Sequence, residues 1–225
     1  MRSQSSGRLG HHGQVTDAPA WWRGEVRPEA PQGYIGPEGV ITGDVSAIKH
    51  PPADPRTGLA SLYFFRAVLR NTELWLNDVH LTVEWSEFHG CHFRQRVRPV
   101  LNELGFAAQG SFGSGPAVYR HCTFERVRFK GLGGFSMDRG RFEDCAFVNC
   151  RWEGHFAGEA DLINNRFIGR MNGCVWFGHS AAGRRNIIEG NDFSQTDFTS
   201  NVGWRFDFPR SDQRWPTGYA PQADG

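Results

Sequence analysis

The sequence predicts an all-β solenoid, a coil whose sides are short strands that stack on the strands of neighbouring turns. Apolar residues recur at every fifth position, in place of the periods of 3.6 and 2 that indicate helices and half-buried strands. A small or medium-sized residue stands two positions before most of them, and the other three positions carry most of the charge. This pattern predicts a chain that turns a corner every five residues, so that four sides complete one turn.

The longest series of five-residue steps runs from Leu132 to Phe177. Nine of its ten positions are apolar, and Asn172 is the exception. Shorter series lie before and after it. The residues that the pattern turns inward are Cys91, Phe93, Cys122, Phe124, Phe142, Cys145, Phe147, Cys150, Trp152, Leu162, Phe167, Phe177, Phe193 and Phe198.

Side chains twenty residues apart should stack, because four sides of five residues return the chain to the same side of the coil. No turn can bury its interior alone, so these contacts should supply most of the stability. The expected pairs are Phe142 with Leu162, Phe147 with Phe167, Trp152 with Asn172, and Ala157 with Phe177.

Residues 191–195 (NDFSQ) and 196–200 (TDFTS) resemble the repeat of the pentapeptide-repeat family, which is roughly small, Asp or Asn, Leu or Phe, polar, Gly. Residues 122–126 (CTFER) and the two steps centred on Phe147 and Trp152 match it at the inward positions. The resemblance covers about 125 residues, roughly 61–93 and 117–208, and implies a right-handed quadrilateral β-helix.

The best-characterised members of that family bind type II topoisomerases, gyrase among them, as mimics of DNA. Such mimicry needs rows of outward carboxylates. Between Tyr119 and Phe208 this chain carries 12 Lys plus Arg and 11 Asp plus Glu. It also lacks the C-terminal helical dimerisation segment of those proteins. Gyrase binding is therefore an alternative to the leading hypothesis.

The solenoid is expected over residues 41–208, between a flexible N-terminal arm at 1–40 and a Pro/Gly-rich tail at 209–225. Two interruptions are expected within it. The first, at 94–118, is an insertion with a short helix from Pro99 to Leu104. The second is a loop at 178–187. Trp21, Trp22 and the segment from Trp204 to Trp215 are candidates to cover the open ends of the coil.

The formal net charge of +1 gives no general attraction to nucleic acid or to an anionic membrane. The N-terminus lacks the apolar stretch of a secretory signal, and no apolar run is long enough to span a bilayer. Five cysteines without a CxxC pair suggest neither a disulfide framework nor a usual zinc site. A cytoplasmic protein with reduced thiols is the expectation.

The only metal-like cluster combines Cys91 and Cys122 with His89, His92 and His121. The pattern turns the cysteines inward and the histidines outward, so they should not share one tetrahedral ion. In a second candidate site, for glycoside chemistry, Asp192 and Asp197 should lie on adjacent sides of the coil and should not converge on a substrate. We therefore predict no catalytic residue, no cofactor and no metal.

The leading hypothesis is a non-catalytic binding or scaffold protein that engages a protein partner through its walls and loops. The residues expected to contact that partner are Arg184, Arg185, Trp204 and Arg205. An enzyme or small-ligand-binding protein with a site under the 94–118 insertion is a further alternative. A pocket lined by convergent polar groups would favour this ligand site, whereas flat walls with exposed Trp204 and Arg205 would favour the scaffold.

Overall fold

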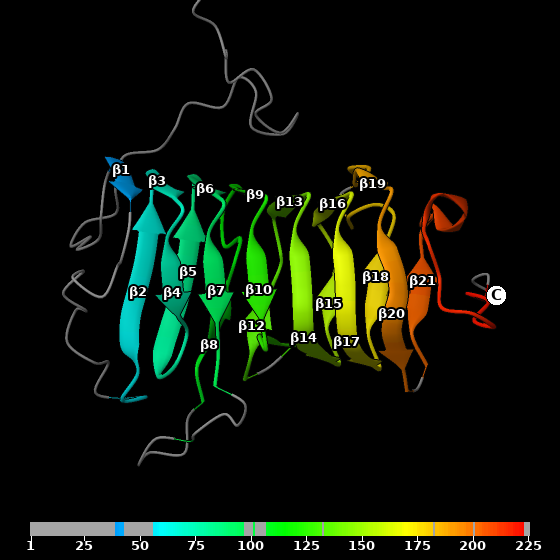
Figure 1. Ribbon diagram of the computed structural model, residues 1–225, viewed down its shortest axis with the longest axis horizontal. Coiled ribbons are helices and arrows are strands. Elements are labelled where there is room, and N and C mark those ends of the chain that lie inside the picture. Colours follow the sequence, from blue (N-terminus) through cyan, green and yellow to red (C-terminus); the bar gives the residue numbers. More distant parts are fainter. Residues whose placement is uncertain are drawn as a thin grey trace, which may run out of the picture.

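The computed structural model describes residues 39–42, 56–96, 101, 107–131, 133–181, 183–199 and 201–222. They form an all-β parallel solenoid of about six turns, which confirms the predicted fold class. Strands of successive turns lie side by side along the long axis of the molecule, from β2 at one end to β21 at the other (Figure 1). The described part of the chain contains no helix long and apolar enough to cross a membrane.

The first sheet takes one strand from each successive turn. Val68 pairs with Glu87, 19 residues along, whereas Glu87 pairs with Val118, 31 residues along, so the turns differ in length. The strands, in spatial order, are β1 (Gly39–Thr42), β3 (Ala67–Arg70), β6 (Ser86–His89), β9 (Ala117–Arg120), β13 (Gly140–Glu143), β16 (Asp161–Ile163) and β19 (Ile188–Glu189).

The second sheet continues round the corners of the coil because its longer strands bend and pair with a different strand at each half. The first half of β14 pairs with β10, and its second half pairs with β11. The strands are β2 (Ala60–Phe65), β4 (Glu73–Trp75), β5 (Val79–Glu84), β7 (His92–Arg94), β8 (Gln109–Ser111), β10 (Thr123–Glu125), β11 (Arg128–Lys130), β12 (Phe135–Ser136), β14 (Ala146–Glu153), β17 (Arg166–Asn172) and β20 (Asp192–Phe198). A third sheet contains β15 (Phe156–Ala157), β18 (Val175–Phe177) and β21 (Gly203–Arg205).

The corner after each strand of the first sheet from β3 onward is built in one way. A single residue adopts the left-handed conformation that turns the chain, with φ between 49° and 64°. The next residue is buried and fills the corner, and the large residue two positions later points into the core from the following strand. This geometry explains the small residue two positions before each large one. The buried corner residues are Thr72, Cys91, Cys122, Cys145, Asn165 and Asn191.

Aromatic rings form continuous stacks inside the coil. Phe142 pairs with Leu162, and Phe147 stacks on Phe167 with ring centroids 4.8 Å apart, as the twenty-residue spacing predicts. Both stacks continue through turns of other lengths, for example from Phe93 to Phe124 at 4.8 Å. Twelve of the fourteen residues expected to face inward are at most 2% exposed. They are Cys91, Phe93, Cys122, Phe124, Phe142, Cys145, Phe147, Cys150, Trp152, Leu162, Phe167 and Phe193.

The other two expected inward residues are only partly buried. Phe198 packs against the edge of the core, where its ring stacks on Tyr219 at 4.2 Å. Phe177 turns away from the core and packs against Phe206 at 5.3 Å, while its neighbour Trp176 is 1% exposed. The assignment of Phe177 to the interior was therefore wrong by one position.

This error starts at an irregularity between β14 and β17. The two strands pair in twenty-residue register up to Val148, and then Cys150 pairs with Gly169, so Asn149 is an extra residue on its strand. Beyond the bulge, Trp152 pairs with the buried Met171 in place of Asn172. Ala157 likewise pairs with Trp176 in place of Phe177. The two expected pairs beyond the bulge were therefore wrong by one residue.

The expected insertion at 94–118 contains a strand of the coil. β8 pairs with β5 and β12, and Phe112, directly after β8, is fully buried among aromatic rings. The sequence did not predict this side of the coil, because Phe112 lies outside the five-residue pattern. The short helix expected from Pro99 to Leu104, the N-terminal arm and the cap expected from Trp21 and Trp22 fall outside the described residues.

The last turn is covered by the segment after β21. Trp215 stacks on Phe193 at 5.2 Å, and the indole nitrogen of Trp204 donates to the hydroxyl of Tyr219 at 3.0 Å. A 3-10 helix at Arg210–Asp212 precedes this contact. The segment from Trp204 to Trp215 thus covers the C-terminal end, as expected for a cap.

Candidate functional site

A groove lies at the corner of the coil where the chain leaves β4 and β7. Its volume is about 310 Å³. Four of the described residues that line it are arginines and two are carboxylates, and most of the others are amides. We call it the arginine groove, and its described lining residues are Asn77, Asp78, Gln95, Arg96, Ala108, Arg126, Arg128, Asn149, Arg151 and Glu153.

Left-handed corner residues form part of the groove. Asp78, Arg126 and Asn149 have φ values of 59°, 60° and 55°. The same conformation turns the chain at the other corners of the coil. Because Arg128 pairs with Arg151, the corners two residues earlier place Arg126 beside Asn149. The stacking of turns thus brings polar side chains from distant parts of the sequence to one place.

The buried Gln95 fixes the chain that leaves β7. Its amide nitrogen donates to the carbonyl of Leu76 at 3.2 Å, and its amide oxygen accepts from the backbone N–H of Arg128 at 2.8 Å. The backbone N–H of Arg96 donates to the Asn77 side chain at 3.0 Å. These bonds tie three successive turns together, so the position of the Arg128 backbone in the groove is set by the core.

The groove carries more positive than negative charge. Arg128 pairs with Glu153 at 2.7 Å, and Arg126 pairs with Glu125 beside the groove at 2.8 Å. Within the described residues Arg151 makes no ion pair, and its side chain is exposed. The hydrogen bond from Arg128, with the charges of Lys130 and Arg151, lowers the pKa of Glu153. Glu153 therefore stays ionised near neutral pH and offsets only part of the positive charge.

Comparison with known proteins gave no matching family model, curated protein or solved structure. The candidate site therefore depends on geometry and chemistry alone.

Arginines continue beyond the groove along the axis of the coil. Arg128 on β11 pairs in register with Arg151 on β14, and Arg151 pairs with Arg170 on β17. Their neighbours Phe129, Trp152 and Met171 are buried, so the three guanidinium groups lie on the outer face. We call these three residues the arginine row. Like charges directly opposite one another on adjacent strands are destabilising, so folding alone does not favour this arrangement.

Two of the four residues expected to contact a partner have structural contacts instead. Trp204 is 2% exposed and packs among the aromatic rings of the cap. The guanidinium of Arg184 donates to the fully buried Asp161 at 3.0 Å and to Asn186 at 2.8 Å. Trp204 therefore cannot serve as an exposed anchor, and Arg184 holds its own loop in place. Arg185 and Arg205 are exposed.

The residues of the metal-like cluster lie on two sides of one wall. Cys91 and Cys122 are 1% exposed, whereas the side chains of His89, His92 and His121 are 20%, 35% and 73% exposed. In the described residues no group of three or more His, Cys, Asp and Glu side chains has metal-binding geometry. Asp192 and Asp197, the other pair considered from the sequence, lie five residues apart on β20 and bond to Ser194 and Arg170 respectively.

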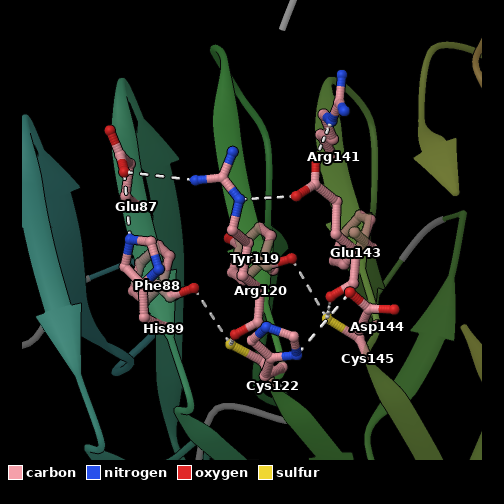
Figure 2. Close-up of polar contacts among 12 residues, drawn as sticks. Glu87, Phe88, His89, Tyr119, Arg120, Cys122, Arg141, Glu143, Asp144 and Cys145 are labelled. Carbon is pink, nitrogen blue, oxygen red and sulfur yellow. Dashed lines mark hydrogen bonds and ion pairs between the residues drawn. The ribbon is translucent and has the colours of Figure 1, made fainter. Parts of the chain in front are cut away.

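The thiols bond to the backbone of the neighbouring turn (Figure 2). The sulfur of Cys122 lies 3.4 Å from the Phe88 carbonyl oxygen, and that of Cys145 lies 3.4 Å from the Tyr119 carbonyl oxygen. Burial raises the pKa of the Cys122 thiol well above its usual range. A neutral thiol is a poor nucleophile and a poor metal ligand, so Cys122 acts as a buried side chain that fills its corner.

The outer face of the first sheet is lined by alternating charges. In Figure 2, Arg120 lies between Glu87 and Glu143, with nitrogen–oxygen distances of 3.9 Å and 2.7 Å, and Glu143 also contacts Arg141. Here each carboxylate has a basic neighbour, so the row is balanced. The arginine row on the other wall differs because its central member, Arg151, makes no direct ion pair within the described residues.

Sequence reasoning missed the arginine groove as a set of residues, although it allowed for a site under the 94–118 segment. The five-residue pattern places Arg126, Arg128 and Arg151 at outward positions, where it does not distinguish them from the other charged residues. The signal that would have revealed them was their equivalent position in consecutive turns. This signal requires the true turn length of 23 residues between Arg128 and Arg151, which a uniform twenty-residue period does not supply.

Proposed function

We propose that this chain is a non-catalytic binding protein and that the arginine groove binds an anionic ligand. The observation that carries the proposal is the convergence of four arginines and two carboxylates in one groove of about 310 Å³. Guanidinium groups bind carboxylates and phosphates through paired hydrogen bonds. The amides of Asn77, Gln95 and Asn149 add hydrogen-bonding groups beside them.

The carboxylates of the groove support a binding role over a catalytic one. General acid catalysis needs a carboxyl group that keeps its proton near neutral pH. The pKa of Glu153 is shifted in the opposite direction by its bond to Arg128. Asp78, the other carboxylate, lies on an exposed corner. Both are suited to accept hydrogen bonds from a ligand.

The groove also supports a ligand site over a flat protein-binding wall. A pocket lined by convergent polar groups favours a ligand site. Flat walls with exposed Trp204 and Arg205 favour a scaffold. Trp204 is buried although Arg205 is exposed, and the groove is present. A protein partner with an acidic segment is compatible with the same groove, and Arg185 and Arg205 remain candidates for its outer contacts.

Titration with citrate, a tricarboxylate, tests the proposal by NMR of the arginine side-chain N–H groups and by calorimetry at low ionic strength. We expect Arg151→Ser to weaken citrate binding about tenfold, the equivalent of one charge-assisted hydrogen bond. Higher salt should weaken binding to the unmodified chain. The matched control is Arg205→Ser, an exposed arginine on β21 that does not line the groove. Equal affinity in both variants and the unmodified chain would refute the groove as the site.

Two finer assignments belong to this proposal. We infer a relationship to the pentapeptide-repeat type, supported by the buried small residue two positions before the stacked Phe147 and Phe167. The variable turn length and the bulge after Val148 depart from that pattern. We also propose a cytoplasmic location, supported by five free and buried cysteines.

A further inference from the structure

The arginine row extends the proposed site from a groove to a line. Strands of adjacent turns are about 4.8 Å apart. Arg128, Arg151 and Arg170 pair in register on three such strands, so their backbones are spaced evenly along the axis of the coil. The first two line the arginine groove, and Arg170 lies one turn beyond it. A ligand that contacts all three must be extended along the coil.

We propose that the ligand is an acidic oligosaccharide, a chain of sugar rings that carries a carboxylate on successive rings, bound along the arginine row with its end in the arginine groove. This inference rests on the proposed function and names its ligand class. A regular row of cations fits a regular row of anions, and one sugar ring is similar in length to the spacing between strands.

The three arginines of the row differ in their ion pairs. The two outer ones are paired with carboxylates, and the central one, Arg151, is available to a ligand. Arg128 is shared with Glu153, and Arg170 is shared with Asp197 at 3.2 Å. The side chains of Arg170 and Asp197 are 63% and 59% exposed, and such exposed pairs contribute little stability. Arg170 can therefore exchange Asp197 for a ligand carboxylate, whereas Arg151 makes no direct ion pair within the described residues that a ligand would have to break.

The mixed polarity of the site favours a sugar over a nucleic acid. Sugar hydroxyls donate hydrogen bonds as well as accept them. Asp78 and Glu153 offer acceptors for them, and Asn77, Gln95 and Asn149 offer both donors and acceptors. Nucleic-acid sites that bind single strands combine basic grooves with exposed aromatic rings on which bases stack. None of the described lining residues of the groove is aromatic.

The test compares galacturonic acid with trigalacturonate, using calorimetry on the full chain. We expect the trimer to bind at least tenfold more tightly than the monomer, because the monomer can contact one arginine of the row and the trimer can contact all three. Arg170→Ser should weaken the trimer about fivefold and leave the monomer and citrate unchanged, since Arg170 lies outside the groove. The matched control is Arg166→Ser on the same strand, whose side chain bonds Gln195.

The outcomes separate this inference from the proposed function. If trimer and monomer bind equally while Arg151→Ser still weakens citrate, the groove stands and the extended ligand is wrong. If Arg170→Ser leaves the trimer unchanged, the row is not the binding track. An oligothymidylate of equal charge that bound more tightly than trigalacturonate would also overturn the inference, in favour of a nucleic acid. Maltotriose, which carries no carboxylate, should not bind measurably.

Discussion

His155 is a buried titratable residue at a corner of the coil. It is 1% exposed and its ring lies between Phe129 and Trp176, with centroids 6.0 Å and 6.1 Å away. Neither ring nitrogen has a hydrogen-bond partner in the described protein. Burial lowers the pKa of His155 to about 4, and the charge of Asp138 opposes this shift. The imidazole is therefore neutral in the folded protein at neutral pH.

The folding stability should consequently fall as pH decreases through the acidic range. The unfolded chain takes up a proton on this histidine near pH 6.5, and the folded chain only near pH 4. The contribution of His155 to the free energy of unfolding is therefore complete above the unfolded pKa. It is lost as the pH falls from about 6.5 to about 4, by on the order of 3 kcal/mol. Urea unfolding at several pH values should show a smaller loss in His155→Phe. His121→Gln, at an exposed histidine, should keep the full loss. An unchanged pH dependence in His155→Phe would contradict this account.

The bulge between β14 and β17 shows how one residue controls a whole element. Gly169 adopts a φ of 146°, and a Cβ atom there would lie 2.1 Å from the backbone oxygen of Cys150. This close approach lets β17 lose one residue relative to β14, which brings Met171 against Trp152. The buried side of β17 therefore depends on Gly169. A glycine is required there because the backbone of Cys150 lies too close for a side chain and because the φ value is unfavourable for other residues.

Gly169→Ala should destabilise the fold by roughly 2–4 kcal/mol, because the backbone of β17 or β14 must shift to accommodate the methyl group. Chemical denaturation provides the measurement. Gly158→Ala is the matched control, since a Cβ atom there meets nothing within 4 Å. If both variants unfolded at the same denaturant concentration as the unmodified chain, the close approach would not be a feature of the protein in solution.

The sequence predicted the stacked turns where the chain is regular and failed where one residue is added. Phe142 and Phe147 were paired correctly because no bulge intervenes before Leu162 and Phe167. A bulge leaves composition and hydrophobicity unchanged, so its position at Asn149 could not be predicted from the five-residue pattern. The arginine groove was missed for a related reason. Its residues become neighbours only through turns of unequal length.

At the scale of the whole molecule, the solenoid must cover the edge of its last turn, because unpaired strand edges invite association. The segment after β21 does this with backbone bonds as well as side chains. The N–H of Phe193 donates to the carbonyl of Arg214 at 2.7 Å, and the N–H of Arg214 donates to the carbonyl of Asn191 at 2.8 Å. Gln213 continues the buried corner series, since its side-chain oxygen accepts from Asn191 at 2.9 Å. The cap thus imitates one more turn.

Removal of the cap should cause the chain to self-associate through its exposed C-terminal end. A chain that stops after Phe208 loses Gln213, Trp215 and Tyr219, and therefore exposes the backbone of β20 and the rings of Phe193 and Phe198. We expect light scattering to show dimers or larger species that grow with protein concentration.

Trp215→Ala in the full chain distinguishes the side-chain packing of the cap from its backbone hydrogen bonds. It should lower the free energy of unfolding by about 3 kcal/mol while keeping the backbone bonds of Arg214. Thr217→Ala, at an exposed position, should match the unmodified chain. A truncated chain that stayed monomeric and equally stable would show that the edge of β20 needs no cover.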